Sequence, residues 1–178
     1  AAGGLLNLLR AGDWHSTGLS CFAVARVTDT AAQRNLIAKW DTTGTLREYS
    51  WSVTATDFAE IRLYIESTDH PSFRTTNAAV TQGSWRTFGT SVTDVAGGAT
   101  AAAGMVMYEN GAVVASTGTE DAAFTTIENT TSVTWIGAQS ATPANFFAGS
   151  IALILLSASA LSASQHFQLS QVSRRFFG

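Results

Sequence analysis

The chain has 178 residues, of which 46% are hydrophobic and 13% charged, and its formal net charge is -3. This length suffices for one well-packed domain, and the weak negative charge argues against nucleic-acid binding, which needs a clustered basic face. The single cysteine, Cys21, excludes an intrachain disulfide and is interpreted as a small buried hydrophobe. The longest apolar run, 151–156, has six residues, whereas a membrane span needs about 20.

Residues 1–19 are interpreted as a lead-in segment. The first ten residues are small and apolar, but they lack the basic leader of a signal peptide. The rest of the chain contains no internal repeat and no low-complexity linker that would mark a boundary. Residues 1–178 are therefore predicted to form a single domain.

From about residue 20 onward, apolar and polar residues alternate, and β-branched and aromatic residues are frequent. This pattern predicts short β-strands. The predicted strands are 20–27, 35–40, 48–54, 60–66, 84–92, 104–109, 112–116, 132–138 and 147–156. Turn sequences at 41–44, 69–71, 97–98, 118–119 and 142–143 separate them. Many short strands with few helices predict an all-β sandwich or jelly roll.

Two local signals are stronger than the rest. Asn110-Gly111, flanked by β-prone arms, predicts a tight hairpin, because a type I′ turn needs positive φ at both central residues. Ser162 and Gln165 form an S-x-x-Q capping box at the start of a predicted helix, 162–176. Phe167, Leu169 and Val172 give this helix a partial apolar face.

Several short motifs follow one another in a fixed order. They are Lys39-Trp40-Asp41, Tyr49-Ser50-Trp51, Trp85, Tyr108 with Asn110-Gly111, Ile136-Gly137, Phe147-Ala148-Gly149 and Ala160-Leu161-Ser162. In this order they resemble the laminin-G-like modules of the concanavalin A-like lectin/glucanase superfamily, over about residues 20 to 175. The resemblance implies an all-β, concanavalin A-like jelly-roll sandwich of two antiparallel sheets with a short C-terminal helix.

The residues agree with such a sandwich. Trp85 and Phe88 are expected to pack between the sheets, as large aromatic residues do. The strand 151–156 is apolar on both faces and is expected to be central and covered on both sides. The glycine-rich stretch 97–104 lacks the Gly-Lys-Ser/Thr ending of a phosphate loop and is interpreted as a loop insertion.

The sequence gives little support for an enzymatic function. Glucanases of the superfamily use closely spaced carboxylates on one strand, whereas here Glu60, Glu66, Glu109 and Glu128 are isolated. The three histidines, His15, His70 and His166, are far apart and show no metal-ligand spacing. A catalytic triad that meets only in space stays open, although no Gly-x-Ser-x-Gly elbow is present.

Calcium is the candidate cofactor, although none is required. Modules that the chain resembles often bind calcium at a rim, where carboxylate and backbone oxygens suit a hard cation. Asp41, Asp69 and Asp94, and also Asp57 and Asp121, lie in or near turns and are candidate ligands. Aspartate in a turn is ordinarily a hydrogen-bonding turn residue, which is the competing interpretation.

Aromatic residues suggest a sugar-binding surface. Tyr49 and Trp51 are two apart on one strand and so share a face, and Arg62 and Tyr64 do the same on the next strand. These four residues are the candidate ligand-binding residues, provided that their rings are exposed on the concave sheet. The competing interpretation is that the rings belong to the core.

Three functions from different classes remain open. The main hypothesis is a non-enzymatic structural or attachment module of a phage virion, in capsid decoration or tail, with protein partners in a homo-oligomer or virion assembly. The alternative is a glycan-binding adhesion module, extracellular or on a surface, with a cell-surface glycan as partner. A glycoside hydrolase or lyase is the weakest hypothesis. None of the three involves nucleic acid or a membrane span.

Overall fold

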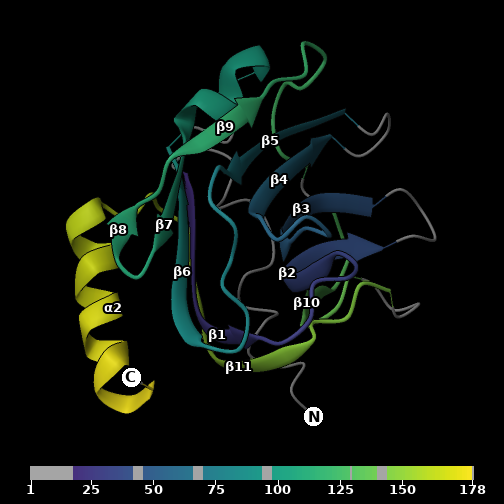
Figure 1. Cartoon of the computed structure of the whole chain (residues 1–178). Helices are drawn as coiled ribbons and strands as arrows, with labels where there is room; N and C mark the ends of the chain where they lie inside the picture. Colours follow the sequence, from purple (N-terminus) through teal and green to yellow (C-terminus); the bar gives the residue numbers. More distant parts are fainter. Residues whose placement is uncertain are drawn as a thin grey trace.

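The computed structural model describes residues 18–41, 46–65, 70–93, 98–128, 130–139 and 144–177. These residues form two antiparallel sheets stacked face to face, with a helix on the outer face of one of them (Figure 1). Sheet A has the order β11 (Gly149–Ser157), β1 (Leu19–Val27), β6 (Trp85–Val92), β7 (Met105–Glu109), β8 (Ala112–Val113). Sheet B has the order β10 (Thr134–Ile136), β2 (Arg34–Asp41), β3 (Leu46–Val53), β4 (Ala59–Ile65), β5 (His70–Thr76), β9 (Ser116–Thr119).

The core lies between the two sheets and follows from the alternation of each strand. In β3, Tyr49, Trp51 and Val53 are buried in the core, while the residues between them belong to the other face of sheet B. Sheet A contributes the alternate residues of β1 together with Phe88, Met105 and Met107. Among the described residues, no helix is long and apolar enough to cross a membrane.

The predicted hairpin is confirmed. Asn110 and Gly111 have φ angles of 52° and 82° and connect β7 to β8. The two positive φ values are those of a type I′ turn, which Asn tolerates and Gly adopts without strain. The turn is also held from outside, because the Asn110 N–H donates to the carbonyl of Thr87 at 2.8 Å.

The C-terminal helix is confirmed, but its buried face differs from the prediction. Helix α2 (Ala163–Phe177) begins with the expected capping box, in which the Ser162 N–H donates to Gln165 Oε1 at 2.8 Å. The side chains that it buries are His166, Ser170 and Ser173, whereas Phe167 and Val172 are 52% and 55% exposed. The predicted apolar face was wrong because α2 packs on β6 through Thr87, Gly89 and Ser91, which admit a close, polar contact.

His166 is the centre of this contact. Its ring stacks on Tyr108 with centroids 4.0 Å apart, and its Nε2 lies 2.9 Å from Ser91 Oγ. The Ser91 hydroxyl donates to the carbonyl of Leu161 at 2.7 Å, so it accepts the proton of His166 Nε2. A Cβ on Gly89 would lie 2.5 Å from His166 Nδ1, so this glycine makes the close approach of α2 to the sheet. Burial lowers the pKa of His166 to about 4.

This environment predicts a pH dependence of folding. The unfolded chain binds a proton at His166 near pH 6.5, while the folded chain keeps the ring neutral down to about pH 4. The contribution of His166 to stability is therefore fully present above pH 6.5 and declines as the pH falls toward 4, by a total on the order of 3 kcal/mol. Urea unfolding of the wild type and of His166→Gln at pH 7, 5.5 and 4.5 measures the difference. An identical pH slope in both proteins would contradict the buried neutral ring.

Two of the strands were not predicted from the sequence, and one segment that was predicted as a loop is helical. β5 and β9 carry polar sequences without apolar alternation, and the sequence suggested turns at 69–71 and 118–119. The stretch expected as a loop forms 3-10 helical turns, η2 (Gly98–Gly104), in which Ala101 and Ala102 are buried in the core. The Glu120 carboxylate holds these turns by accepting from the N–H groups of Ala102 and Ala103, each at 2.9 Å.

Two further core expectations were wrong. β11 is the edge strand of sheet A rather than a central one, and its Leu153 is 41% exposed. A short apolar run does not by itself distinguish an edge strand that packs beside a helix from a central strand. Phe88 is buried in the core as expected, but Trp85 is 36% exposed, because it pairs with Arg26 and so lies on the outer face of sheet A.

Candidate functional site

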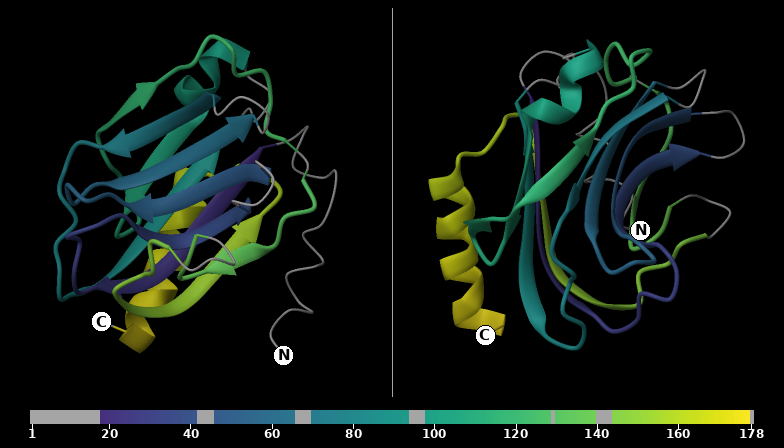
Figure 2. Two further views of the ribbon diagram at one scale, coloured as in Figure 1. Left: turned by 90° about the vertical axis from the view of Figure 1, so that its right-hand side faces the viewer. Right: turned by 45° about the horizontal axis from the view of Figure 1, so that its top comes forward.

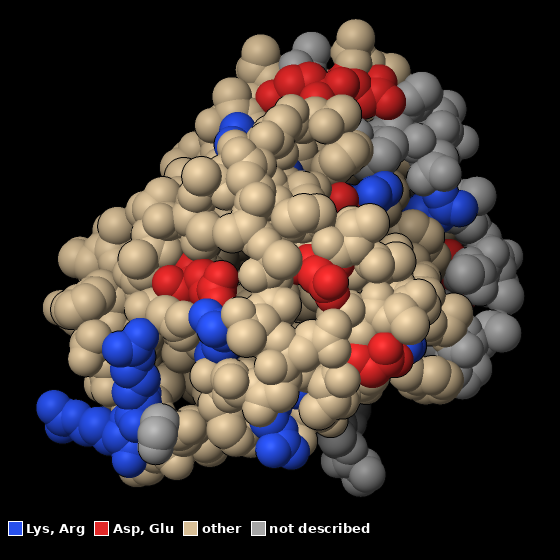
Figure 3. All heavy atoms as spheres, in the orientation of Figure 1, with Lys and Arg blue, Asp and Glu red and all other residues tan. Residues whose placement is uncertain are grey.

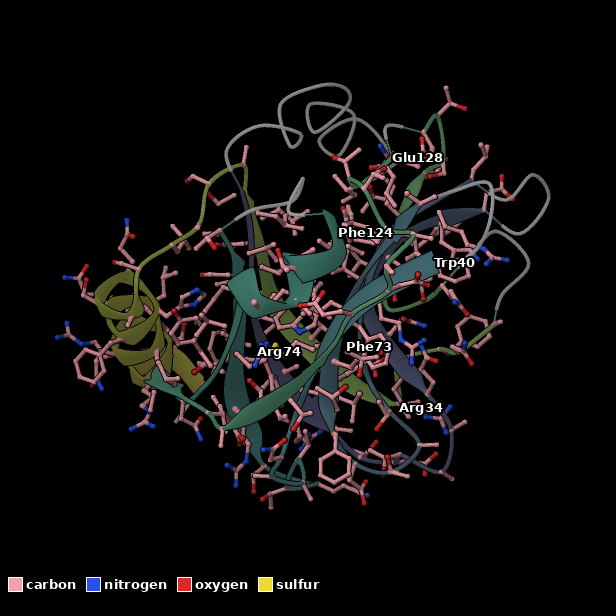
Figure 4. The ribbon with its side chains drawn as sticks, turned by 90° about the horizontal axis from the view of Figure 1, so that it is seen from above. Arg34, Trp40, Phe73, Arg74, Phe124 and Glu128 are labelled. Atoms are coloured by element: carbon pink, nitrogen blue, oxygen red, sulfur yellow. The ribbon has the colours of Figure 1, made fainter. Side chains whose placement is uncertain are left out.

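The two sheets differ in what covers their outer faces. Helix α2 lies against sheet A, and among the described residues no helix lies over the outer face of sheet B, which faces the viewer in the left view of Figure 2. Strand alternation brings the residues between the core positions to this face. They include Trp40 from β2 and Phe73 from β5, which lie across the molecule from α2 (Figure 4). The outer face of sheet B is the candidate site.

The lower layer of the site is aromatic and buried. Trp40 and Tyr64 meet edge to face, with ring centroids 4.8 Å apart and an interplanar angle of 86°. They are 8% and 4% exposed, and with Ala38 they form a small apolar cluster separate from the main core. Burial raises the pKa of Tyr64, and the charge of Arg62 partly opposes it, so Tyr64 stays neutral. These two buried rings form the base of the site.

The upper layer consists of guanidinium groups stacked on aromatic rings. Arg62 lies over Phe73 at 4.6 Å from the ring centroid, and Arg47 lies over Trp40 at 4.8 Å. Cross-strand register produces the first pair, because Arg62 of β4 is opposite Phe73 of β5. A stacked guanidinium keeps its N–H edge available for hydrogen bonding while its face is held by the ring.

Glu60 fixes the orientation of Arg62. The two side chains form an ion pair, and the Thr75 hydroxyl donates to Glu60 Oε2 at 2.9 Å. Burial acts to lower the pKa of Arg62, but the contacts with Glu60 outweigh it, and the pKa lies above its ordinary value. The Glu60 side chain is 5% exposed and that of Arg62 is 33% exposed, so the cation is what the site presents to solvent. We call Trp40, Arg47, Glu60, Arg62, Tyr64 and Phe73 the sheet B cluster.

The structure divides the four predicted ligand-binding residues into two pairs. Arg62 and Tyr64 lie in the sheet B cluster. Tyr49 and Trp51 are 1% and 0% exposed in the core between the sheets, so the expectation that they present rings to solvent was wrong. The members of each pair share one face of their strand, as predicted. The two pairs lie on opposite faces of sheet B, because the cross-strand neighbour of Tyr49 is Leu63 and not Tyr64.

Sequence reasoning missed Trp40, Arg47 and Phe73. In the sequence, Trp40 stands out as part of the Lys39-Trp40-Asp41 motif, although Ala38 and Trp40 also share the alternation that a strand face requires. A register shift between Lys39 and Trp40 brings Arg47 opposite Trp40, and such irregularities leave no clear sequence signal. Phe73 lies in β5, which was not predicted as a strand.

A second polar group lies next to the site, and its two charges are paired with each other. Lys39 Nζ is 2.5 Å from Glu48 Oε1, and both side chains are under 5% exposed. The Thr130 hydroxyl donates to the same oxygen at 2.9 Å. Burial raises the pKa of Glu48, and the ion pair with Lys39 and the bonds from Thr130 oppose that rise. These contacts tie the segment around Thr130 to sheet B, which is a structural role.

The described residues offer no geometric support for the predicted calcium site. Of its three main candidates, Asp41 ends β2, while Asp69 and Asp94 lie outside the described residues. Within the described ranges, no group of three or more His, Cys, Asp and Glu side chains is placed to hold a metal ion. Asp121 accepts from the N–H of Ala123 at 2.9 Å, which is an ordinary turn role. Calcium binding stays a prediction.

Comparison with known proteins gives likeness in structure alone. No family model matches the sequence, and no curated protein matches it. Among solved structures, the Ruminococcus gnavus IT-sialidase CBM40 bound to α2,3-sialyllactose is similar with a TM-score of 0.66 and 17% identity, over 87% of this chain and 83% of that chain. The SAP-like pentraxin of Limulus polyphemus is similar with a TM-score of 0.59 and 13% identity, over 87% of this chain and 70% of that one.

A third similar structure is that of botulinum neurotoxin type C, whose cell entry depends on interaction with two ganglioside molecules. Its TM-score is 0.57 at 11% identity, over 88% of this chain and 36% of that chain. This chain has the concanavalin A-like jelly-roll fold. The narrower assignment to laminin-G-like or phage-type modules stays a prediction. In the described part of the chain, no helix covers the outer face of sheet B (Figure 2). That face carries the sheet B cluster.

Proposed function

We propose that this jelly roll is a glycan-binding module, extracellular or on a surface, that binds its ligand through the sheet B cluster. The observation that carries the proposal is the pair of guanidinium groups stacked on Phe73 and Trp40, on the sheet face that no described helix covers. The similar R. gnavus CBM40 structure, which holds sialyllactose, supports the choice of ligand class.

The cluster supplies both kinds of contact that a sugar needs. Arg62 donates hydrogen bonds in fixed directions to hydroxyl or carboxyl oxygens of the glycan. The Phe73 ring offers an apolar surface to the C–H face of a pyranose. Glu60 and Thr75 are positioning residues, because they hold the Arg62 guanidinium by the ion pair and the hydrogen bond described above. Prepositioned donors reduce the entropy that binding costs.

Arg62→Gln tests the cluster directly. Glutamine keeps a polar side chain but loses the charged fork, so glycan affinity is expected to fall at least tenfold, which corresponds to about 1.4 kcal/mol. Isothermal titration with a glycan selected on an array measures the loss. Arg34→Gln is the matched control, because Arg34 is also a sheet B arginine but pairs with Asp29 outside the cluster. Unchanged affinity of a folded Arg62→Gln protein, or an equal loss in Arg34→Gln, contradicts the proposal.

The proposed module is not an enzyme. A glycosidase needs two carboxyl groups that are free to react across the bond to be cleaved, at about 5–9.5 Å from each other. Glu48 and Glu60, the buried carboxylates of sheet B, are instead paired with Lys39 and Arg62. The matching test is incubation with the glycan that the protein binds. Release of new reducing ends would contradict the non-enzymatic proposal.

Attachment to other protein subunits, in a homo-oligomer or in a virion, is the second candidate function. It is favoured by apolar side chains that α2 leaves in solvent, with Phe167, Val172 and Phe176 exposed by 52%, 55% and 75%. Beside them, Leu155, Leu169 and Val172 line a groove between β11 and α2. Light scattering after size exclusion tests this candidate, and a monomer at all accessible concentrations would remove the homo-oligomeric form of it.

A further inference from the structure

The edge strand β11 is apolar on both faces, and one of them is open to solvent. Leu153 and Leu155 lie opposite Val24 and Phe22 of β1. Phe22 contacts the ring of His166 in α2, so these two leucines are on the outer face of sheet A. The inner face of β11 packs on the main core, whereas Leu153 on the outer face is 41% exposed. An apolar strip of this kind is stabilised by a segment that covers it.

Helix α2 turns this strip into a groove. The groove has a volume of about 590 Å³ and runs between β11 and α2, beside the helix in Figure 1. Leu161, Leu169 and Val172 form its helix side, and Val172 is 55% exposed. The other lining residues are Leu155, Leu156, Ser157, Gln165 and Gln168. We call it the β11–α2 groove.

The β11–α2 groove is neutral. None of its lining residues carries a charged side chain. The arginines of α2, Arg174 and Arg175, follow Val172 in the last turn of the helix. Figure 3 shows Lys and Arg atoms gathered beside the C-terminal end of the chain. A charged ligand would lose hydration in the groove without gaining a partner, so the groove suits a neutral and apolar segment.

The chain contains such a segment outside the described residues. Residues 5–9 are Leu-Leu-Asn-Leu-Leu, and the first charged side chain in the sequence is that of Arg10. Four leucines within five residues carry apolar area that is favourable to bury. Residues 5–9 therefore match the β11–α2 groove in both charge and polarity.

The described part of the chain begins beside this groove. A Cβ on Gly18 would lie 3.2 Å from the backbone nitrogen of Ala160. The N–H of Leu161, which lines the groove, donates to Ser20 Oγ at 2.7 Å. The residues that precede Gly18 therefore join the described chain at the end of the groove where α2 starts.

The connection is long enough. Residues 10–17 span at most about 26–29 Å when extended. From Gln165 to Val172, the helix side of the groove rises only about 11 Å. Residues 5–9 can therefore reach any part of the groove from Gly18.

We propose that residues 5–9 occupy the β11–α2 groove of their own chain. Their leucine side chains pack between Leu153 and Leu155 of β11 and Leu169 and Val172 of α2, so that β11 is covered on both faces. In this position the segment also blocks the groove against other copies of the chain. The contact is independent of the sheet B cluster and does not rest on the proposed glycan binding. A second copy that places the same segment in this groove is the competing occupant.

A nitroxide at position 7 of the full chain tests the contact by NMR. Asn7→Cys provides the attachment site, because Cys21 is buried and burial raises the pKa of its thiol, so that it stays unreactive. The amide signals of Leu155 and Leu169 are expected to lose most of their intensity through paramagnetic broadening. The amide of Thr75, in β5 of the other sheet, is expected to keep its intensity. Dilution of the labelled protein with unlabelled chain leaves the broadening unchanged if the contact is within one chain.

Val172→Asp places a charge in the groove and is expected to abolish the broadening at Leu155. Val113→Asp is the matched control, because Val113 is 60% exposed on β8, and it leaves the broadening unchanged. The proposal is overturned if Leu155 is not broadened, if Leu155 and Thr75 are broadened equally, or if the broadening persists in folded Val172→Asp. Broadening that arises only between chains, in a mixture of isotope-labelled and nitroxide-labelled protein, would assign the groove to a second copy and also overturn it.

Discussion

Replacement of Trp51 by alanine is expected to lower the free energy of unfolding by about 3–5 kcal/mol, the usual cost of removing a large aromatic side chain from a core. Trp51 is fully buried and lies opposite Ile37 on one side and Ile61 on the other in sheet B. Its removal leaves a cavity between the sheets that neighbouring strands cannot close. Urea unfolding followed by circular dichroism measures the loss.

Trp85→Ala is the control for this variant, because Trp85 is 36% exposed and belongs to no core cluster. Its stability loss is expected to be smaller, since a half-exposed ring gains less from burial. A Trp51→Ala protein with nearly normal stability but without glycan binding would contradict the structure, because it would place Trp51 in the ligand site rather than in the core.

Lys39→Met is expected to destabilise the fold by about 3–5 kcal/mol at neutral pH, because it leaves Glu48 buried without its cation. Burial already raises the pKa of Glu48 against the effect of Lys39, and removal of the lysine raises it further. A carboxyl with a raised folded pKa favours the folded state at low pH and loses that contribution as the pH rises through the folded pKa. The penalty of Lys39→Met is therefore expected to shrink from pH 7 toward pH 4, measured by urea unfolding.

The double variant Lys39→Met/Glu48→Leu separates the pair from its two members. Replacement of a buried ion pair by apolar residues is often neutral or stabilising, so the double variant is expected to recover most of the stability that Lys39→Met loses. Thr130 then loses its acceptor, which limits the recovery. A double variant as unstable as Lys39→Met would show that Glu48 is not left as an uncompensated charge.

The sequence predicts the fold better than its details. Asn110-Gly111 and the Ser162–Gln165 capping box are local signals, because a positive φ pair or a cap depends on few residues. The edge position of β11 and the polar face of α2 depend on distant partners. His166 is buried because Gly89 and Tyr108, far from it in the sequence, form its cavity. Tertiary packing overrides the apolar pattern of Phe167 and Val172.

Two of the four predicted ligand-binding residues lie in the candidate site. The spacing of Arg62 and Tyr64 correctly indicates one shared face, but alternation does not say which face points toward the core. Tyr49 and Trp51 share a face by the same rule and lie on the core side. Partners from other strands, Trp40 and Phe73, complete the cluster through register, and the sequence alone does not specify register.

The most direct test of glycan binding through the sheet B cluster is a glycan array probed with the wild-type chain and with folded Arg62→Gln and Arg34→Gln. The wild type is expected to bind at least one glycan, and Arg62→Gln is expected to lose that binding at least tenfold at an unchanged melting temperature. Arg34→Gln is expected to keep the wild-type affinity, because Arg34 pairs with Asp29 outside the cluster. A wild-type chain that binds no glycan, or a folded Arg62→Gln chain that binds every glycan as the wild type does, would contradict the proposed function.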